Sequence, residues 1–242
     1  MKDQNTAKLA VPGSRIGEYG FHQPAVGRLS AMMRILRKIR RNFRDNSLVW
    51  TLIKMFGLIG WPIYYRRTYR LYRVDLSRMN TPASADVSFA FRFLKPDDIE
   101  YVNQIYHLEE WLEGRMESVF KSGGICLVAL DGSTVAGFNL VSFRNMNLPV
   151  VQYSRALRSN QAFSVQISVA NRYRCRGLGT ALRLEIFKAL RLRGTRYLYG
   201  GTDIHNRANL ALCRKVGFKA IADVRYTKLF RHEETLLHRV RT

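Results

Sequence analysis

The segment between Phe163 and Phe218 constrains the fold of this chain more than any other part of it. In residues 163–169, β-branched side chains alternate with polar ones, which predicts a strand. From Leu178 to Leu190, aliphatic residues recur at helical spacing. The basic turn of residues 174–180, which contains Gly177 and Gly179, stands between them, so the sequence predicts a strand, a glycine-bearing turn and a helix in immediate succession.

A turn of this kind is suited to binding an anion. The first N–H groups of a helix have no partner within it, and the positive end of the helix dipole lies behind them. Glycine lets a bulky anion approach the main chain, and Arg172, Arg174 and Arg176 add positive charge. The segment therefore predicts a site for a phosphorylated cofactor. A tight strand-to-helix turn with solvated arginines is the alternative interpretation.

A second motif begins 27 residues after Gly179, at Asn206. It predicts a helix with leucines on one face, closed by Gly217, with Phe218 starting a strand. Arg-x-x-Gly-x-Gly, a strand, and Asn-(x)5-Leu-x-x-Lys-x-Gly-Phe resemble motifs A and B of the GCN5-related N-acetyltransferases (GNAT). The resemblance covers residues 87–230. It implies an α+β fold, with a mixed, mainly antiparallel sheet flanked by helices.

The resemblance implies acetyl-CoA, or another acyl-CoA, as co-substrate, and no metal. Main-chain groups of Ile167 and Val169 would pair with the pantetheine arm, and Asn206 would cap its helix, touch the cofactor, or do both. The pyrophosphate would lie on the backbone N–H groups of Arg174, Cys175, Arg176, Gly177, Leu178, Gly179 and Thr180. Asn171 and Cys175 stand where the family frequently has proline and glycine, a change that affects loop conformation.

The implied reaction is direct attack of an amine on the thioester. Val169 N–H is the predicted donor to the thioester carbonyl. Cys213 stands where the family often has a tyrosine that protonates the thiolate, and a small apolar residue on a buried helix face is its alternative role. His205 is the predicted base, because histidine titrates near neutrality, and a structural role at a helix start is its alternative.

Residues 163–169 contain no Asp or Glu that could act as the base. Glu109 and Glu110 lie in the helical region that lines the acceptor side in the family that the chain resembles. They are further candidates for the base, with a solvated helix face as the alternative.

Composition limits the partners and the compartment. The 242 residues carry a formal net charge of +22, and residues 1–80 hold 16 of the 40 Lys and Arg but only 4 of the 18 Asp and Glu. Such a charge attracts anionic lipid, nucleic acid or phosphorylated substrates. Three scattered cysteines support neither a disulfide framework nor a zinc site, and no apolar leader precedes a cleavage site, so we expect a cytoplasmic protein.

The N-terminal third is predicted to be an extension. Residues 1–29 are rich in glycine and proline and predict a flexible tail, and residues 30–80 predict a basic, aromatic, amphipathic helical extension that begins at Ser30. Lys54 and Pro62 argue against a stable membrane span, whereas Trp, Tyr and Arg together are typical of an interface anchor. We expect residues 30–75 to contact an anionic membrane. Packing within the protein or an oligomer is the alternative, and nucleic-acid binding is less favoured.

Residues 87–230 are predicted to form the acyltransferase domain. The expected order is a strand at 87–93, helices to 122, a hairpin around Asp131 and Gly132, and an irregular loop at 144–162 over the substrate. A strand at 197–199 and a hairpin or long strand at 220–230 follow, and residues 231–242 are predicted to be a C-terminal tail.

These features predict an acyl-CoA-dependent N-acyltransferase, peripheral to the inner membrane face. Its acceptor would be a primary amine of a small molecule or a carrier-linked compound, for example an amino sugar. A non-catalytic CoA-binding adaptor and a protein N-acetyltransferase are the alternatives. The sequence predicts no oligomeric state.

Overall fold

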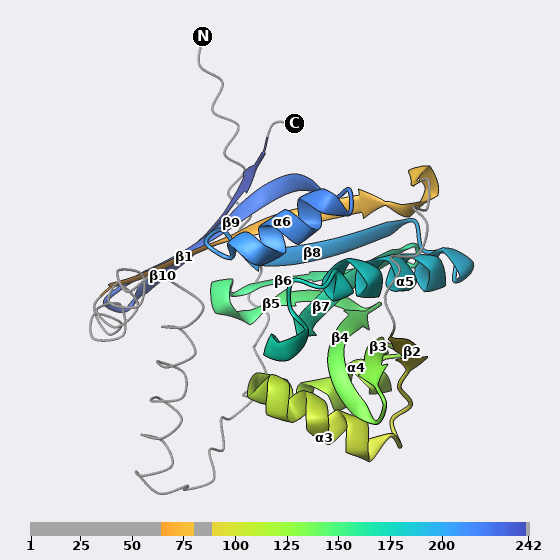
Figure 1. The fold of residues 1–242 in the computed structure, drawn as a ribbon. Coiled ribbons are helices and arrows are strands. Elements are labelled where there is room, and N and C mark those ends of the chain that lie inside the picture. Colours follow the sequence, from red (N-terminus) through yellow and green to blue (C-terminus); the bar gives the residue numbers. More distant parts are fainter. Residues whose placement is uncertain (1–63, 80–88, 241–242) are drawn as a thin grey trace, which may run out of the picture. The chain divides into compact units, whose positions relative to one another are not determined.

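The computed structural model of the protein describes residues 64–79 and 89–240 (Figure 1). The predicted tail of residues 1–29, the helix predicted from Ser30 and the apolar stretch up to residue 63 lie outside this part of the chain. No helix in the described ranges is long and apolar enough to cross a membrane.

The main element is an eight-stranded sheet in the order β10-β9-β1-β8-β7-β4-β3-β2, and β5 and β6 form a separate hairpin. The pairs β1/β8, β2/β3, β3/β4 and β4/β7 are antiparallel, whereas β7 and β8 are parallel. The strands are β1 (Tyr64–Asp75), β2 (Ala90–Phe93), β3 (Ile125–Asp131), β4 (Thr134–Ser142), β5 (Asn145–Leu148), β6 (Tyr153–Ala156), β7 (Gln161–Val169), β8 (Tyr197–Asp203), β9 (Lys219–Leu229) and β10 (His232–Arg239). This sheet confirms the predicted α+β class.

Helices cover both faces of the sheet. They are α3 (Ile99–Leu108), α4 (Arg115–Lys121), α5 (Leu178–Leu192) and α6 (Arg207–Lys215). Short 3-10 turns are η1 (Leu76–Arg78), η2 (Glu110–Leu112), η3 (Pro149–Val151) and η4 (Asn171–Tyr173). One apolar cluster joins α5 and α6 to the sheet, and a second lies between α3, α4 and the opposite face, because β4 directs Val141 into the first and the adjacent Leu140 into the second.

The chain divides into two compact units. The first comprises residues Met1–Arg66 and Thr227–Glu234; its described part holds an ion pair of 3.1 Å between Lys228 Nζ and Glu233 Oε1. The second comprises Arg67–Tyr226 and Thr235–Thr242 and contains every site residue discussed below.

Residues 64–75 correct the predicted helical extension, because they form strand β1 between β8 and β9. The strand pairs with β8 from Tyr69 opposite Asp203 to Asp75 opposite Tyr197, and Leu71, Tyr72 and Val74 are buried. Two of its arginines are also bound within the protein: Arg67 donates to Asp203 Oδ2 at 2.9 Å, and Arg70 forms two hydrogen bonds to the Asp223 carboxylate, of 2.8 and 2.9 Å. The alternation of tyrosine and arginine in this segment therefore suits a strand between two others.

Five further expectations can be compared with the structure. The hairpin at Asp131 and Gly132 and the strands at 197–199 and 220–230 are confirmed as β3/β4, β8 and β9. Residues 144–162 are not an irregular loop, because they contain the β5–β6 hairpin, and the predicted C-terminal tail contains β10.

Candidate functional site

The parallel strands β7 and β8 separate halfway along β7. They pair only from Gln161 opposite Tyr197 to Ser164 opposite Gly200, whereas β7 continues to Val169. On its other edge, β7 stays paired with β4 as far as Val169 opposite Gly137, with a register shift at Val165 that leaves this residue as a bulge. A bulge bends a strand and increases its twist, so it accounts for the separation.

The separation leaves the main-chain groups of Ile167 and Val169 without a partner strand, although Arg174 Nε donates to Val169 O at 3.2 Å. At the end of β7, Ala170 N–H donates to Ala136 O at 2.9 Å, toward β4. Because successive residues of a strand direct their N–H and C=O groups to opposite edges, those of Ile167 and Val169 face the opening. This orientation suits the predicted roles of both residues, which stay predictions.

The turn that follows β7 presents free amides. Within the described residues, the N–H groups of Cys175, Arg176 and Gly177 donate to no backbone carbonyl. Cys175 and Gly177 both take left-handed conformations, with φ of 63° and 78°, and Gly177 is the N-cap of α5. Alternating left-handed residues turn successive amides toward one point and form an anion-binding concavity. Leu178 and Gly179 add the first N–H groups of the helix.

The two motif glycines have different local functions. A Cβ at Gly177 would meet nothing within 4 Å, so this position of the turn faces open space. A Cβ at Gly179 would lie 3.4 Å from Leu212 Cδ2, so this glycine allows α5 to pack closely on α6. These features fit the pyrophosphate of an acyl-CoA. The residues from Arg174 to Thr180, including Arg176, would hold it.

A carboxylate reaches β7 from a distant part of the chain. Ser168 Oγ donates to Glu109 Oε1 at 2.9 Å, and Trp111 Nε1 donates to Glu109 Oε2 at 3.1 Å. Glu109 lies between α3 and η2, and Arg115 stacks on the Trp111 ring at 5.2 Å. The structure thus supplies the carboxylate that residues 163–169 lack. The sequence indicated Glu109 only because it lies in the helical region expected on the acceptor side. The neighbouring Glu110 is exposed.

The predicted residues beyond β8 have mixed surroundings. His205 is exposed at the turn between β8 and α6, and its backbone N–H donates to Asp203 Oδ1 at 2.9 Å. Asp203 Oδ2 accepts a hydrogen bond of 2.9 Å from Arg67. Asn206 caps α6, since its Oδ1 accepts from Asn209 N–H at 3.1 Å. The carboxyl ends of parallel β7 and β8 lie at one edge of the sheet, which places His205 on the same side as the basic turn.

Cys213 lies in the core, with 3% of its surface exposed. Burial raises the pKa of its thiol, and the nearby Arg183 guanidinium acts in the opposite direction. Burial also lowers the pKa of Arg183 to about 10. A buried thiol of raised pKa is a weaker acid, which favours the packing role of Cys213; its role as the catalytic acid stays a prediction.

Comparison with known proteins identifies the family. Residues 89–218 match the model of the acetyltransferase (GNAT) family. The match spans more than half of the chain, so the chain belongs to this family of acetyltransferases, as the sequence motifs predict. No curated protein sequence matches the chain.

Solved structures share the fold. A GCN5-related N-acetyltransferase from Sphaerobacter thermophilus superposes with a TM-score of 0.51 and 18% identity, over 75% of this chain and 57% of that one. A second structure is a fungal multi-domain GH3 β-N-acetylglucosaminidase with a GCN5-related glucosamine N-acetyltransferase region. It superposes with a TM-score of 0.51 and 15% identity, over 75% of this chain and 23% of that one. This chain therefore matches only part of each of the two proteins.

Proposed function

We propose that this protein transfers an acyl group, in the first instance acetyl, from acyl-CoA to a primary amine. The observation that carries the proposal is the edge of β7 that β8 leaves unpaired beyond Ser164, which leads directly into the Cys175–Gly177 turn, whose amides donate to no backbone carbonyl of the described residues. The pantetheine arm would pair with that edge, and the pyrophosphate would lie on the turn.

The residues have distinct roles in this reaction. The attacking amine must be neutral, so a base takes its proton, and either Glu109 or His205 supplies that base. The amine nitrogen forms a bond to the acyl carbon while the bond from that carbon to sulfur breaks. Val169 N–H stabilises the negative charge that develops on the carbonyl oxygen. The departing thiolate takes a proton from Cys213 or from water, and the second proton that the nitrogen loses as the amide forms returns to that donor.

We favour Glu109 over His205 as the base. Its two carboxylate oxygens are held by Ser168 on β7 and by Trp111, so the carboxylate has a fixed position beside the strand whose edge is open. His205 is exposed, on the turn between β8 and α6. A group with a fixed position needs less reorganisation in the transition state.

We propose that the acceptor reacts through a primary amine. An amino sugar on a small molecule or a carrier is our specific candidate, and it rests on the expected membrane contact. Glucosamine belongs in any panel of acceptors, because the fungal protein named above has a glucosamine N-acetyltransferase region.

The location is a further part of the proposal: cytoplasmic, and peripheral to an anionic membrane surface through the N-terminal extension. The sequence predicted membrane contact for residues 30–75. Because β1 begins at Tyr64 and belongs to the sheet, we now propose this contact for residues 30–63 alone. Deletion of residues 1–60, which spares β1, is expected to release the protein from vesicles that contain anionic lipid. Unchanged sedimentation with the vesicles would contradict the membrane contact.

Calorimetric titration of acetyl-CoA tests the cofactor site. Gly177→Trp is expected to weaken binding at least tenfold, because it places a bulky side chain on the turn that presents the amides and strains its left-handed backbone, with φ of 78°. Gly194→Trp is the matched control, since Gly194 has the same φ of 78°, also has nothing within 4 Å of its Cβ position, and follows the opposite end of α5. Equal binding by the two variants would remove the pyrophosphate site from the turn.

A non-catalytic CoA-binding adaptor is the second candidate, favoured by the burial of Cys213 at the position where an acid is expected. Thiol release from acetyl-CoA with a panel of amines separates the two functions. Binding without thiol release would favour the adaptor. A protein N-acetyltransferase is less favoured, because a net charge of +22 repels basic tails.

A further inference from the structure

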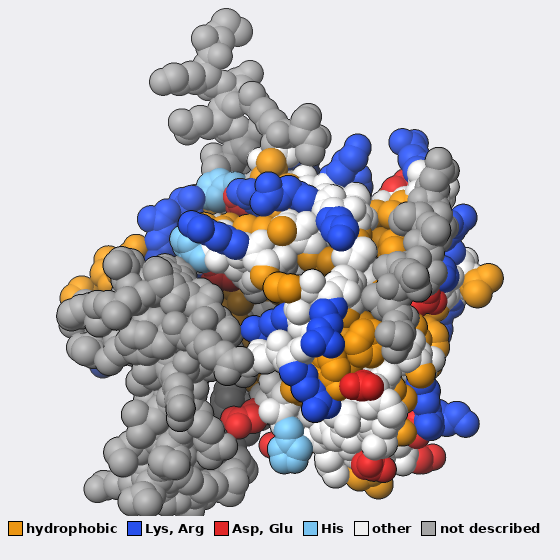
Figure 2. Space-filling view, in the orientation of Figure 1, with side chains coloured by type: hydrophobic (Ala, Val, Ile, Leu, Met, Phe, Trp, Pro, Cys, Tyr) orange, Lys and Arg blue, Asp and Glu red, His pale blue; other side chains and the backbone are white. Residues whose placement is uncertain are grey.

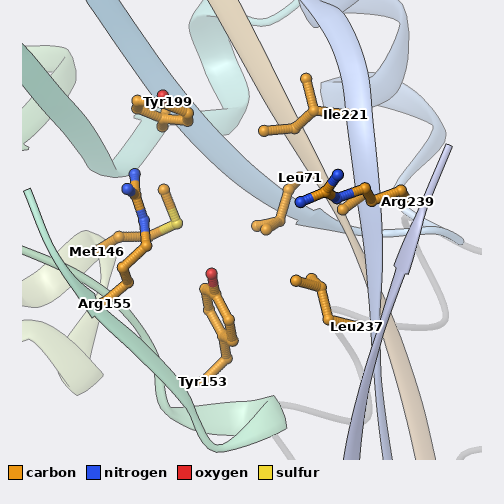
Figure 3. Close-up of a pocket in the computed structure, with 9 residues that line it drawn as sticks. Leu71, Met146, Tyr153, Arg155, Tyr199, Ile221, Leu237 and Arg239 are labelled. Atoms are coloured by element: carbon orange, nitrogen blue, oxygen red, sulfur yellow. The ribbon is translucent and has the colours of Figure 1, made fainter. Parts of the chain in front are cut away.

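A cavity of about 250 Å³ lies on the face of the sheet that α5 and α6 leave uncovered (Figure 3). The β5–β6 hairpin contributes Met146, Tyr153 and Arg155, and the strands contribute Leu71, Tyr199 and Arg239. None of these residues belongs to the predicted acyl-CoA site.

Contacts between the hairpin and the sheet hold the walls of the cavity in place. Gln152 Nε2 donates to Tyr226 Oη at 3.2 Å, and Thr235 Oγ1 donates to Val151 O at 3.3 Å. Leu148 packs against β8 so closely that a Cβ at Gly201 would lie 2.8 Å from it. The cavity is therefore preformed by contacts on three strands.

Two arginines approach the cavity from opposite sides. Figure 3 shows Arg155 beside Tyr199 on one side and Arg239 on the other, with the Tyr153 hydroxyl pointing into the space between them. Arg155 stacks on the Tyr199 ring at 5.1 Å and donates to Gln161 Oε1 at 3.3 Å. No carboxylate lines the cavity, and no ion pair joins either arginine to an acid in the part of the chain that the structure describes.

The remaining wall is apolar, and Leu71 and Met146 are buried in it. Burial also raises the pKa of Tyr153, so its hydroxyl stays protonated at neutral pH and can donate a hydrogen bond. Two guanidinium groups with one hydroxyl donor suit an anionic group, and the apolar wall suits a hydrocarbon body. The volume is below the range of about 300–1,000 Å³ that is usual for whole ligands, so the cavity suits one end of a molecule.

The cavity and the Ser168–Glu109 pair lie on the same face of the sheet. In β8, Leu198 packs in the cluster with α5, and a Cβ at Gly200 would contact Phe218 of that same cluster. Tyr199 and Gly201 therefore face the other way, toward the hairpin. The pairing of β8 with β7 stops at Gly200, so the opening between the strands begins one residue beyond Tyr199. From Tyr199 to Asp203, where β8 ends, the strand rises about 13 Å, at about 3.3 Å per residue.

We propose that this cavity binds the non-reacting end of the acceptor, and that this end carries an anionic group on an apolar body. The inference rests on the proposed acyl transfer. The amine at the other end of such an acceptor would extend along β8 toward the opening between β7 and β8. Arg155 and Arg239 are specificity-determining residues in this arrangement, and they take no part in the transfer itself.

Binding to the full chain without acyl-CoA tests the cavity. Hexanoate and 1-hexanol are the probes, because they share an apolar body and differ in charge, and the methyl NMR signal of Met146 is the readout. Hexanoate is expected to shift this signal at millimolar concentration, with binding at least about fivefold weaker in Arg239→Gln and in Arg155→Gln. Arg158→Gln, an exposed arginine outside the lining residues, is the matched control and is expected to bind like the native protein. An equal response to hexanol, or an unmoved Met146 signal, would overturn the inference.

Turnover separates this inference from the proposed function. With acetyl-CoA, 6-aminohexanoate is expected to give a kcat/KM at least about fivefold above that of hexylamine, and Arg239→Gln is expected to abolish the difference by raising KM. An equal kcat/KM for 6-aminohexanoate and hexylamine would overturn the inference and leave the proposed acyl transfer in place. Absence of thiol release with every amine, with the hexanoate response retained, would count against acyl transfer instead.

Discussion

The hydroxyl of Ser168 donates a hydrogen bond of 2.9 Å to Oε1 of Glu109, a residue 59 positions earlier in the chain. The bond connects the strand with the open edge to the segment that follows α3, and Trp111 holds the second oxygen of the same carboxylate. A charge-bearing group is thus fixed beside the proposed path of the thioester.

Glu109→Gln is expected to lower kcat by about 100-fold or more, because the amide cannot accept the proton of the amine. Steady-state thiol release over a range of pH measures the change, and acetyl-CoA affinity is expected to stay the same. Glu110→Gln, at the exposed neighbouring position, is the control and is expected to retain full turnover. If kcat survives in the Glu109 variant and falls in His205→Gln, the base is His205.

Cys175→Gly is expected to stabilise the protein by about 0.5–1 kcal/mol. Cys175 has a φ of 63°, and a left-handed conformation costs a residue with a Cβ about 1–2 kcal/mol, part of which the greater chain entropy of glycine offsets. Urea unfolding measures the difference. Cys175→Ala keeps the Cβ and is expected to leave stability nearly unchanged; the same gain in both variants would show that strain is not the cause.

Cys213→Ala is expected to lower stability by about 1 kcal/mol and to retain turnover, because the side chain fills core space beside Phe218. Thermal unfolding and thiol-release assays on the same preparation measure the two effects. A fall in kcat of about 100-fold without a loss of affinity for acetyl-CoA would instead restore Cys213 as the acid that protonates the thiolate.

Stability is expected to fall as the pH rises above about 9, owing to the buried thiol of Cys126. Burial raises the pKa of this thiol above its ordinary value, so the unfolded chain loses the proton first and unfolding is favoured between the unfolded and the folded pKa. In that window, one such group lowers the free energy of unfolding by about 1.4 kcal/mol for each pH unit. Urea unfolding from pH 7 to pH 10 measures the slope. Cys126→Ala is expected to flatten it while lowering stability at pH 7, and an unchanged slope would contradict the assignment.

The surface also shows how charge is distributed around these sites. In Figure 2, Lys and Arg side chains are spread over the visible described surface, and acidic side chains are fewer. Among the described residues, Arg174 and Arg176 are exposed at the turn, where a phosphorylated co-substrate would approach. Arg67 and Arg70 instead bind Asp203 and Asp223 within the sheet.

Local patterns predicted the site that lies within one continuous stretch of chain. The alternation in residues 163–169, the glycines at 177 and 179, and the Asn206 cap each depend on neighbours a few positions away. Their conformations therefore follow from propensity and spacing. The structure shows the strand, the turn and both helices where they were expected.

The sequence by itself determined the strand, the glycine-bearing turn and the helix that carry the family motif, because backbone conformation there depends on residues close in the chain. Only the tertiary structure decided that β1 is a strand inside the sheet, that Glu109 meets Ser168, and that Arg155 and Arg239 face one cavity. Each of these depends on a partner far away in the chain, such as Asp203 for Arg67 at a separation of 136 residues. A mixture of tyrosine and arginine suits either a membrane-interface helix or a strand, and the neighbour on each edge decides between them.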